Sequence, residues 1–148
     1  MKVSVVGSGY VGSVTAACLA ELGHQVICID IDEERVNKIN SGISPIWEEG
    51  LDVLIQKHAG NNLKATSDYK SAVLDSDISF ICVGTPSDDY GNIDLSIVKA
   101  ASESLGRAIG NKDSYHVVVV KSTVVPETTE NFVTPILEQS SEKQAGID

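Results

Sequence analysis

The chain has 148 residues and a formal net charge of −10, a size typical of one domain with a substantial buried core. The acidic excess argues against a nucleic-acid partner or an anionic membrane surface, because nothing in the chain would replace the counterions of a phosphate backbone. No apolar stretch is long enough to span a bilayer, and Met1-Lys2 leads directly into an apolar run without room for a signal peptide. We therefore expect a cytoplasmic protein.

The first 30 residues have the pattern of a strand, a glycine-rich turn, a helix and a second strand. An apolar run at residues 3–6 precedes Gly7-Ser8-Gly9-Tyr10-Val11-Gly12, and a second run ends at Asp30, 18 residues after Gly12. In this pattern the first glycine permits the tight turn, the second lets the backbone approach a pyrophosphate, and the third lets the helix pack against the sheet. The helix start also offers unpaired N–H groups and a positive dipole end. We predict a dinucleotide site here rather than a plain strand–turn–helix connection.

Helical and extended patterns alternate along the chain. A helix is predicted over residues 10–22, ending at Gly23, and its buried face is expected to consist of Val11, Val14, Ala17, Cys18 and Leu22. Asp32, Ser67-Asp68 and Asp94 are expected to cap further helices. Further strands are predicted at residues 25–30, 63–66, 77–83 and 115–121. Further helices are predicted at residues 33–40, 51–58, 68–73, 94–109 and 128–140.

This alternation predicts an α/β fold with a doubly wound, mostly parallel Rossmann sheet and helices on both faces. Residues 41–50, with Pro45 and Trp47, are expected to form an ordered loop, and Pro135 favours a kink in the last helix. In such a sheet ligands bind beyond the carboxyl ends of the strands. Functional side chains are therefore expected directly after residues 6, 29, 83 and 120.

Asp30 is expected to end the second strand, where its carboxylate can accept hydrogen bonds from an adenosine ribose and would repel a 2′-phosphate. The sequence thus favours NAD over NADP. Arg35 is a reservation, since it would neutralise that corner if it lay against Asp30 rather than over the adenosine side of the cleft. The alternative for Asp30 is a solvated acid in a turn.

Hydroxyl groups follow two later strands. Gly84-Thr85-Pro86-Ser87 comes after one and Lys121-Ser122-Thr123 after the next, so these hydroxyls are expected across the cleft from the glycine-rich turn, near a nicotinamide. Taken singly, each is equally compatible with a turn or cap residue.

Other titratable residues give no sign of catalytic or metal chemistry. Cysteines occur at positions 18, 28 and 82, each in an expected strand or helix, and are predicted to be reduced, buried and inert. The histidines at positions 24, 58 and 116 show no metal-ligand spacing, so no metal site is expected. The pairs Glu48-Glu49 and Asp88-Asp89 are expected to be solvated acids.

Five segments together resemble the N-terminal domain of the UDP-glucose/GDP-mannose dehydrogenase family. They are the glycine-rich turn at residues 7–12, Asp30-Ile31-Asp32, the loop at residues 42–51, Val83-Gly84-Thr85-Pro86, and Lys121-Ser122-Thr123-Val124. The family oxidises the C6 hydroxyl of a nucleotide sugar to a carboxylate, with two NAD molecules and a thiohemiacetal on a catalytic cysteine.

The resemblance implies a role for individual residues. It implies that NAD contacts Gly7, Gly9, Tyr10, Val11, Gly12, Asp30, Arg35, Thr85 and Thr123. Thr123 also matches a family threonine that helps hold a water near the reacting centre, which makes it the one candidate catalytic residue of this chain. The nucleotide sugar would bind through other domains, and the full-length enzyme is expected to be a homo-oligomer.

Two departures from the family pattern qualify the resemblance. Glu127 stands where the family usually has glycine, which puts the local backbone conformation in doubt. The family's Pro-Glu-Phe-Leu segment, dimerisation helix and catalytic cysteine would lie beyond Asp148. We therefore expect residues 1–148 to be an NAD-binding domain that stops before its last strand, without the central and C-terminal domains, and that binds NAD without turning over a sugar nucleotide.

Two other readings of the chain remain open. One is a regulatory Rossmann domain that senses NAD. The other is a cofactor domain of the hydroxyacid or 6-phosphogluconate dehydrogenase group, which shares the glycine-rich turn but gives no reason for residues 45–51 and 121–124.

Overall fold

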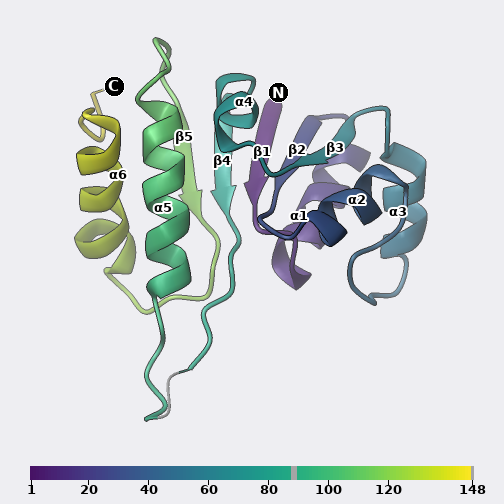
Figure 1. Cartoon of the computed structure of the whole chain (residues 1–148), viewed down its shortest axis with the longest axis horizontal. Helices are drawn as coiled ribbons and strands as arrows, with labels where there is room; N and C mark the ends of the chain where they lie inside the picture. Colours follow the sequence, from purple (N-terminus) through teal and green to yellow (C-terminus); the bar gives the residue numbers. More distant parts are fainter. Residues whose placement is uncertain (88–89, 148) are drawn as a thin grey trace.

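The computed structural model describes residues 1–87 and 90–147, in which five parallel strands form one sheet (Figure 1). The order β3-β2-β1-β4-β5 places the first strand at the centre, with chain neighbours running outward on either side. The strands are β1 (Lys2–Val6), β2 (Gln25–Ile29), β3 (Leu63–Thr66), β4 (Ile78–Ile81) and β5 (Val117–Val120). The predicted doubly wound parallel sheet is therefore confirmed.

Six α-helices cover the two faces of the sheet in the described part of the chain. They are α1 (Tyr10–Glu21), α2 (Glu33–Asn40), α3 (Leu51–His58), α4 (Tyr69–Leu74), α5 (Ser96–Ile109) and α6 (Thr134–Ser141). Alternate residues of each strand contribute to two separate cores: Val3 and Val5 pack with α1, α2 and α3, whereas Val6 packs with α4 and α5. Helices thus lie on both faces, as predicted. Within the same residues no helix is both long and apolar enough to cross a membrane.

The strands end in register at one edge of the sheet. Val6 pairs with Ile29 on one side and with Ile81 on the other, and Ile81 pairs with Val120. The residues that follow these four positions therefore emerge along one edge. β4 ends at Ile81, not at Val83, and β5 spans Val117–Val120 rather than 115–121, because ladder pairing stops before the apolar run does.

The predicted buried face of α1 is wrong at four of its five positions. Only Ala17 is buried, while Val11, Val14, Cys18 and Leu22 are exposed. The face against the sheet is made of small residues, namely Gly12, Ser13, Ala16, Ala17 and Ala20. Small side chains let the helix axis approach the strands closely, so the packing does not follow the pattern of large apolar residues.

The cysteine prediction holds for two residues and fails for Cys18, which is exposed on α1. Cys28 and Cys82 are buried. Burial raises the pKa of the Cys28 thiol to about 12 and that of Cys82 to about 11. Both are therefore protonated, unreactive thiols at neutral pH.

Aspartates cap the helices largely as expected. Asp32 Oδ1 accepts hydrogen bonds from the N–H groups of Glu34 and Arg35, and Asp68 accepts one from Ser71. At α5 the N-cap is Leu95, although the Asp94 carboxylate still accepts a hydrogen bond from Ser96 N at 2.8 Å.

The break expected near Pro135 takes the form of a π-helical turn over Thr129–Val133, followed by α6. Proline lacks an N–H group and its ring crowds the preceding turn. The wider turn moves Pro135 into the first turn of α6, where no N–H group is needed. Thr134 donates to Thr129 O through both its N–H and its Oγ1, the latter at 2.9 Å.

A network of buried polar side chains lies on one face of the sheet, toward the amino ends of its strands. Lys112 Nζ donates to Ser76 O and lies 3.1 Å from His116 Nδ1, which assigns the ring proton to Nε2. His116 Nε2 then donates to Ser79 Oγ at 2.8 Å, and Ser79 bonds Ser4. Burial, and next the charge of Lys112, lower the pKa of His116 to about 4.

Stability should fall as the pH drops from about 6.5 to about 4. His116 is neutral in the folded chain down to about pH 4, whereas an unfolded histidine takes up its proton near pH 6.5. The unfolded state therefore binds more protons in this window, which destabilises the fold by roughly 3 kcal/mol in total. Urea titrations of the wild-type chain and of His116→Gln measure this, and the variant should lack that part of the pH dependence. Parallel pH profiles for the two chains would contradict it.

Glu127 adopts a left-handed conformation, with φ of +68°, in the turn between β5 and the π-helical turn. Glycine adopts this conformation without strain, whereas a residue with a side chain does not, so Glu127 occupies a position that suits glycine better. Glu127 O accepts a hydrogen bond from Asn131 N at 2.9 Å, which fixes the turn.

Replacing Glu127 by glycine should stabilise the chain by about 0.5–1 kcal/mol. The left-handed strain of a side chain costs ~1–2 kcal/mol, and the extra freedom of glycine in the unfolded chain offsets part of the gain. Glu127→Ala is the matched control, because it also removes the carboxylate but keeps the strain. A glycine variant no more stable than the alanine variant in chemical denaturation would refute the interpretation.

Candidate cofactor site

The glycine-rich turn lies at the carboxyl end of β1, where the order of the sheet reverses between β1 and β4. Gly7 has φ of +93°, and its N–H donates to Ile29 O at 2.7 Å. A Cβ at Gly7 would lie 3.1 Å from both Cys82 O and Val83 Cα. The turn therefore rests directly on the chain that leaves β4, and only glycine fits there.

Gly12 brings the first turn of α1 against this glycine-rich turn. A Cβ at Gly12 would lie 1.7 Å from Gly7 O and 3.3 Å from Cys82 Cβ. No side chain can occupy that space without moving the helix. The close helix–sheet packing expected at Gly12 is present.

Gly9 is the N-cap of α1, and its surroundings suit an anion. A Cβ built at Gly9 meets no atom within 4 Å, so the backbone faces open space. In the described chain no side chain caps this helix, and its first turn carries no acidic residue. The first N–H groups of α1 therefore lack side-chain acceptors and can face a phosphate. Tyr10 and Val11 are exposed on the same turn.

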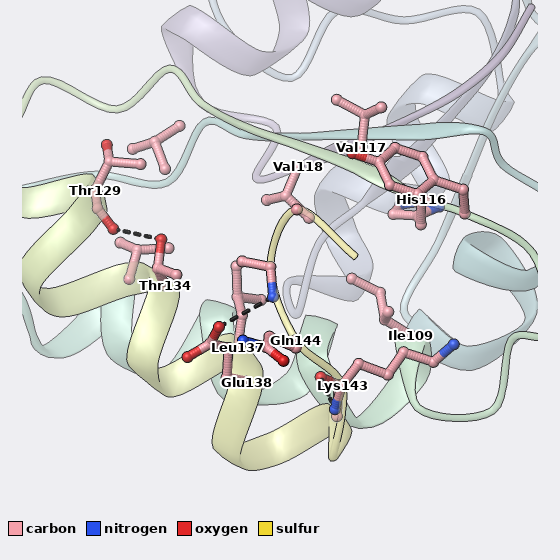
Figure 2. Close-up of a pocket in the computed structure, with 16 residues that line it drawn as sticks. Ile109, His116, Val117, Val118, Thr129, Thr134, Leu137, Glu138, Lys143 and Gln144 are labelled. Atoms are coloured by element: carbon pink, nitrogen blue, oxygen red, sulfur yellow. Dashed lines mark hydrogen bonds between the residues drawn. The ribbon is translucent and has the colours of Figure 1, made fainter. Parts of the chain in front are cut away.

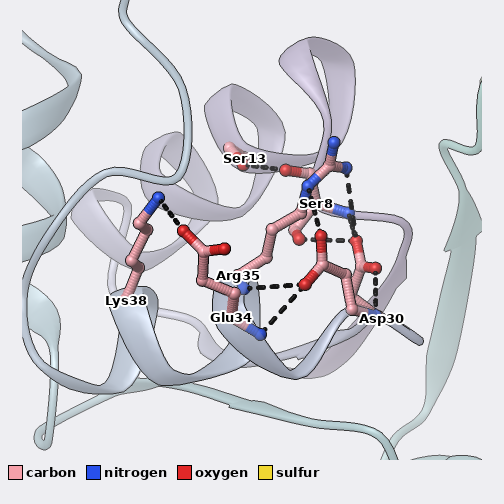
Figure 3. Close-up of polar contacts among 7 residues, drawn as sticks. Ser8, Ser13, Asp30, Glu34, Arg35 and Lys38 are labelled. Carbon is pink, nitrogen blue, oxygen red and sulfur yellow. Dashed lines mark hydrogen bonds and ion pairs between the residues drawn. The ribbon is translucent and has the colours of Figure 1, made fainter.

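Asp30 follows β2 and is held beside the glycine-rich turn (Figure 3). Its side chain is only 8% exposed. Asp30 Oδ2 accepts hydrogen bonds from Ser8 N and Ser8 Oγ, each at 2.6 Å, and Oδ1 accepts one from Asp32 N at 3.0 Å. The carboxylate thus has a fixed orientation rather than that of a freely solvated turn acid.

Arg35 reaches back from α2 toward the same corner (Figure 3). Its NH1 lies 3.9 Å from Asp30 Oδ2, and its Nε lies 3.4 Å from Asp32 Oδ2. The side chain is 42% exposed, so these ion pairs are screened by solvent and weak. Arg35 therefore does lie against Asp30, and its guanidinium offsets part of the negative charge of that carboxylate.

The ends of β4 and β5 are joined by hydroxyl groups. Thr85 Oγ1 donates to Thr123 O at 2.9 Å, and Ser122 Oγ donates to Val83 O at 2.7 Å. The two threonines predicted from separate segments are thus brought together. The side chain of Thr123 is exposed at this edge. The Thr85 hydroxyl thus links the segments that follow β4 and β5. Its oxygen keeps lone pairs that can still accept hydrogen bonds.

A separate groove lies between β5 and α6 (Figure 2). It has a volume of about 230 Å³, and its lining includes Val118, Val120, Leu137 and the chain around Gln144. None of the residues predicted to contact NAD lines it. The groove is therefore distinct from the candidate cofactor site.

The described residues contain no group of three or more His, Cys, Asp and Glu side chains placed to hold a metal ion. His58, for example, is satisfied by Glu21 Oε2 at 2.5 Å and Asn62 Oδ1 at 2.8 Å. The expected solvated pair Asp88-Asp89 lies outside the described residues.

Ser8 is a member of the site that the sequence pattern did not single out. It is fully buried, and it links the glycine-rich turn to Asp30 across 22 residues of chain. A small hydroxyl residue between the first two glycines was the available signal. Its role depends on the approach of Asp30, which only the fold reveals.

Comparison with known proteins identifies relatives along the whole chain. The model of the UDP-glucose/GDP-mannose dehydrogenase family, NAD binding domain, matches residues 1–148. UDP-glucose 6-dehydrogenase of Haloferax volcanii is 49% identical over 99% of this chain, and GDP-mannose 6-dehydrogenase of Pseudomonas aeruginosa is 48% identical over 100%. In each case the match covers 34% of the relative. The chain thus spans about a third of the length of these proteins.

Solved structures give the same result. A ternary complex of GDP-mannose dehydrogenase from Pseudomonas aeruginosa superposes with a TM-score of 0.97 at 48% identity, covering 100% of this chain and 34% of that one. UDP-glucose dehydrogenase from Pyrobaculum islandicum superposes with a TM-score of 0.91 at 38% identity, covering 96% and 33%. A diketoreductase at 22% identity shares the fold alone, with a TM-score of 0.61, 94% of this chain and 45% of that one.

These matches decide among the family assignments that the sequence left open. A relationship to the hydroxyacid or 6-phosphogluconate group would not produce a full-length match to the nucleotide-sugar family at this level of identity. NAD, the predicted cofactor, is the one that the family description names. The chain belongs to the UDP-glucose/GDP-mannose dehydrogenase family, to its NAD-binding domain.

Proposed function

We propose that this chain is the NAD-binding part of a nucleotide-sugar 6-dehydrogenase, which oxidises a sugar C6 alcohol to the carboxylate with two NAD molecules. The observation that carries the proposal is the shared carboxyl edge, where an open helix N-terminus, a buried carboxylate and two hydroxyl-bearing strand ends meet. The names of the relatives, UDP-glucose and GDP-mannose 6-dehydrogenase, supply the substrate class.

Each predicted residue has a chemical task in this proposal. The glycines of the turn let backbone N–H groups near Tyr10 and Val11 approach the pyrophosphate. Asp30 accepts a hydrogen bond from the adenosine ribose, with Arg35 alongside. Thr85 and Thr123 bind on the nicotinamide side, and Thr123 also holds a water near the reacting centre. When bound, NAD supplies the hydride acceptor.

The nucleophile of the complete enzyme is not one of the three cysteines of this chain. Cys82 comes closest to the edge, but it is buried beneath the glycine-rich turn and its pKa is raised to about 11 by burial. Cys28 is buried within β2, and Cys18 is exposed in the second half of α1, away from the helix start that lies at the carboxyl edge. A separate cysteine and a sugar-binding domain are therefore part of the proposal, and the homo-oligomeric assembly is included only because the family resemblance implies it. The free thiols also fit a cytoplasmic location.

The chain should bind NAD more tightly than NADP, and Asp30→Ala should reduce the difference between the two affinities. Loss of a hydrogen bond to a charged group weakens NAD binding by roughly 10- to 100-fold. At the same time Arg35 remains to face a 2′-phosphate, which favours NADP. Isothermal titration of both cofactors measures the two effects.

Asp32→Asn is the matched control for this test. It also removes one carboxylate beside Arg35 but keeps a good helix cap and leaves Asp30 in place. The control should retain the preference for NAD. Equal affinity of the unmutated chain for NAD and NADP would show that Asp30 does not select the cofactor.

The chain by itself should produce no NADH from UDP-glucose or GDP-mannose, even at saturating NAD, because its cysteines are not placed to form a thiohemiacetal. NADH absorbance measures this directly, with a full-length relative as the positive control. Turnover by this chain alone would overturn the proposal that the catalytic cysteine is a separate one. A regulatory NAD-sensing role would instead require that NAD change the chain's binding to another protein.

A further inference from the structure

Ser8 is placed to control the orientation of Asp30. Its backbone N–H and its hydroxyl both donate to the same oxygen, Asp30 Oδ2, each at 2.6 Å (Figure 3). Ser8 is fully buried, so water does not compete for either hydrogen bond. Ser13 Oγ donates to Ser8 O at 2.8 Å and fixes the turn from the other side.

The hydrogen-bond capacity of the carboxylate is therefore almost used up within the protein. A carboxylate has about four lone-pair positions, two on each oxygen. Ser8 fills both on Oδ2, and Asp32 N fills one on Oδ1 at 3.0 Å. Arg35 NH1, at 3.9 Å, is beyond hydrogen-bond distance. Among the described residues these contacts leave one acceptor position, and it is on Oδ1.

We infer that Ser8 is a positioning residue for cofactor selection, whose hydroxyl holds Asp30 Oδ2 and leaves Oδ1 to accept a hydrogen bond from the adenosine 2′-hydroxyl. This inference rests on the proposed NAD site and names the atom through which that site recognises ribose. The N–H of Ser8 is likewise committed to Asp30. The phosphates are therefore left to the N–H groups that follow Ser8, at the start of α1.

Arg35 explains why Asp30 needs to be held. The guanidinium lies within ion-pair distance of Asp30 Oδ2, on the side that Ser8 occupies. Without the Ser8 hydroxyl, the carboxylate can turn toward Arg35 and form a closer ion pair. Such a rotation moves Oδ1 and spoils its alignment with the ribose.

The test compares the binding of NAD with that of its 2′-deoxyadenosine analogue, which lacks only the hydroxyl in question. Ser8→Ala should weaken NAD binding about tenfold, as expected for one charge-assisted hydrogen bond and the order that it imposes. Binding of the 2′-deoxy analogue should change far less. In an Asp30→Ala background, Ser8→Ala should have no further effect on NAD, because the group through which Ser8 acts is gone.

Ser13→Ala is the matched control, since Ser13 is an equally buried serine bonded to the same turn that does not touch Asp30. Ser13→Ala should weaken the binding of NAD and of the 2′-deoxy analogue to the same extent, or leave both unchanged. If Ser8→Ala does not fold, Ser8→Cys provides the same measurement, because the thiol is similar in size but a poor donor.

The outcomes separate the inference from the proposed function. Equal losses of NAD and 2′-deoxy analogue in Ser8→Ala, as in Ser13→Ala, would overturn the inference, and so would an additive loss in the Asp30→Ala background. Failure of the wild-type chain to bind NAD would instead overturn the proposed function.

Discussion

Two glycines, Gly7 and Gly12, determine how the glycine-rich turn and α1 meet the sheet. A Cβ at Gly12 would lie 1.7 Å from Gly7 O, and one at Gly7 would lie 3.1 Å from the chain leaving β4. Three elements therefore converge at contact distance where the sheet order reverses. The contact places the start of α1 over the carboxyl ends of β1 and β4 and directs Ser8 toward Asp30. The geometry of the site depends on this packing before any polar group contributes.

Strand register then decides which side chains share the edge. Val6, Ile29, Ile81 and Val120 lie in one row across four strands, so the residues after them emerge together. Hydrogen bonds from Thr85 to Thr123 O and from Ser122 to Val83 O hold the two segments beyond β4 and β5 together. The distance across the edge is thus set by backbone pairing and short polar ties rather than by long loops.

Features encoded by local chemistry could be predicted from the sequence, and features that depend on close approach could not. The bounds of α2, α3 and β3 agree with the predicted ones because caps and turn residues mark their ends. The face of α1 was predicted wrongly, since glycine, serine and alanine form its contact with the sheet while Val14 and Cys18 face outward. Hydrophobic periodicity cannot detect a face made of small residues. The role of Ser8 escaped for a related reason, because it depends on Asp30, 22 residues away.

The acidic composition of the chain does not prevent it from offering a site for an anion, because the local field at the edge differs from the net charge. Helices α1 and α2 begin near the same edge. The start of α2 is occupied by acids: Asp32 caps it, and Glu33 and Glu34 lie in its first turn. Within the part of the chain that the structure describes, the start of α1 has neither a side-chain cap nor an acid in its first turn. Helix N–H groups act over only a few ångströms, so the −10 charge spread over the surface matters less to a phosphate than these nearest donors do. In the proposed NAD site, the acids at α2 and their absence at α1 would suit opposite ends of one ligand, with ribose hydroxyls beside Asp30 and phosphates beside Gly9.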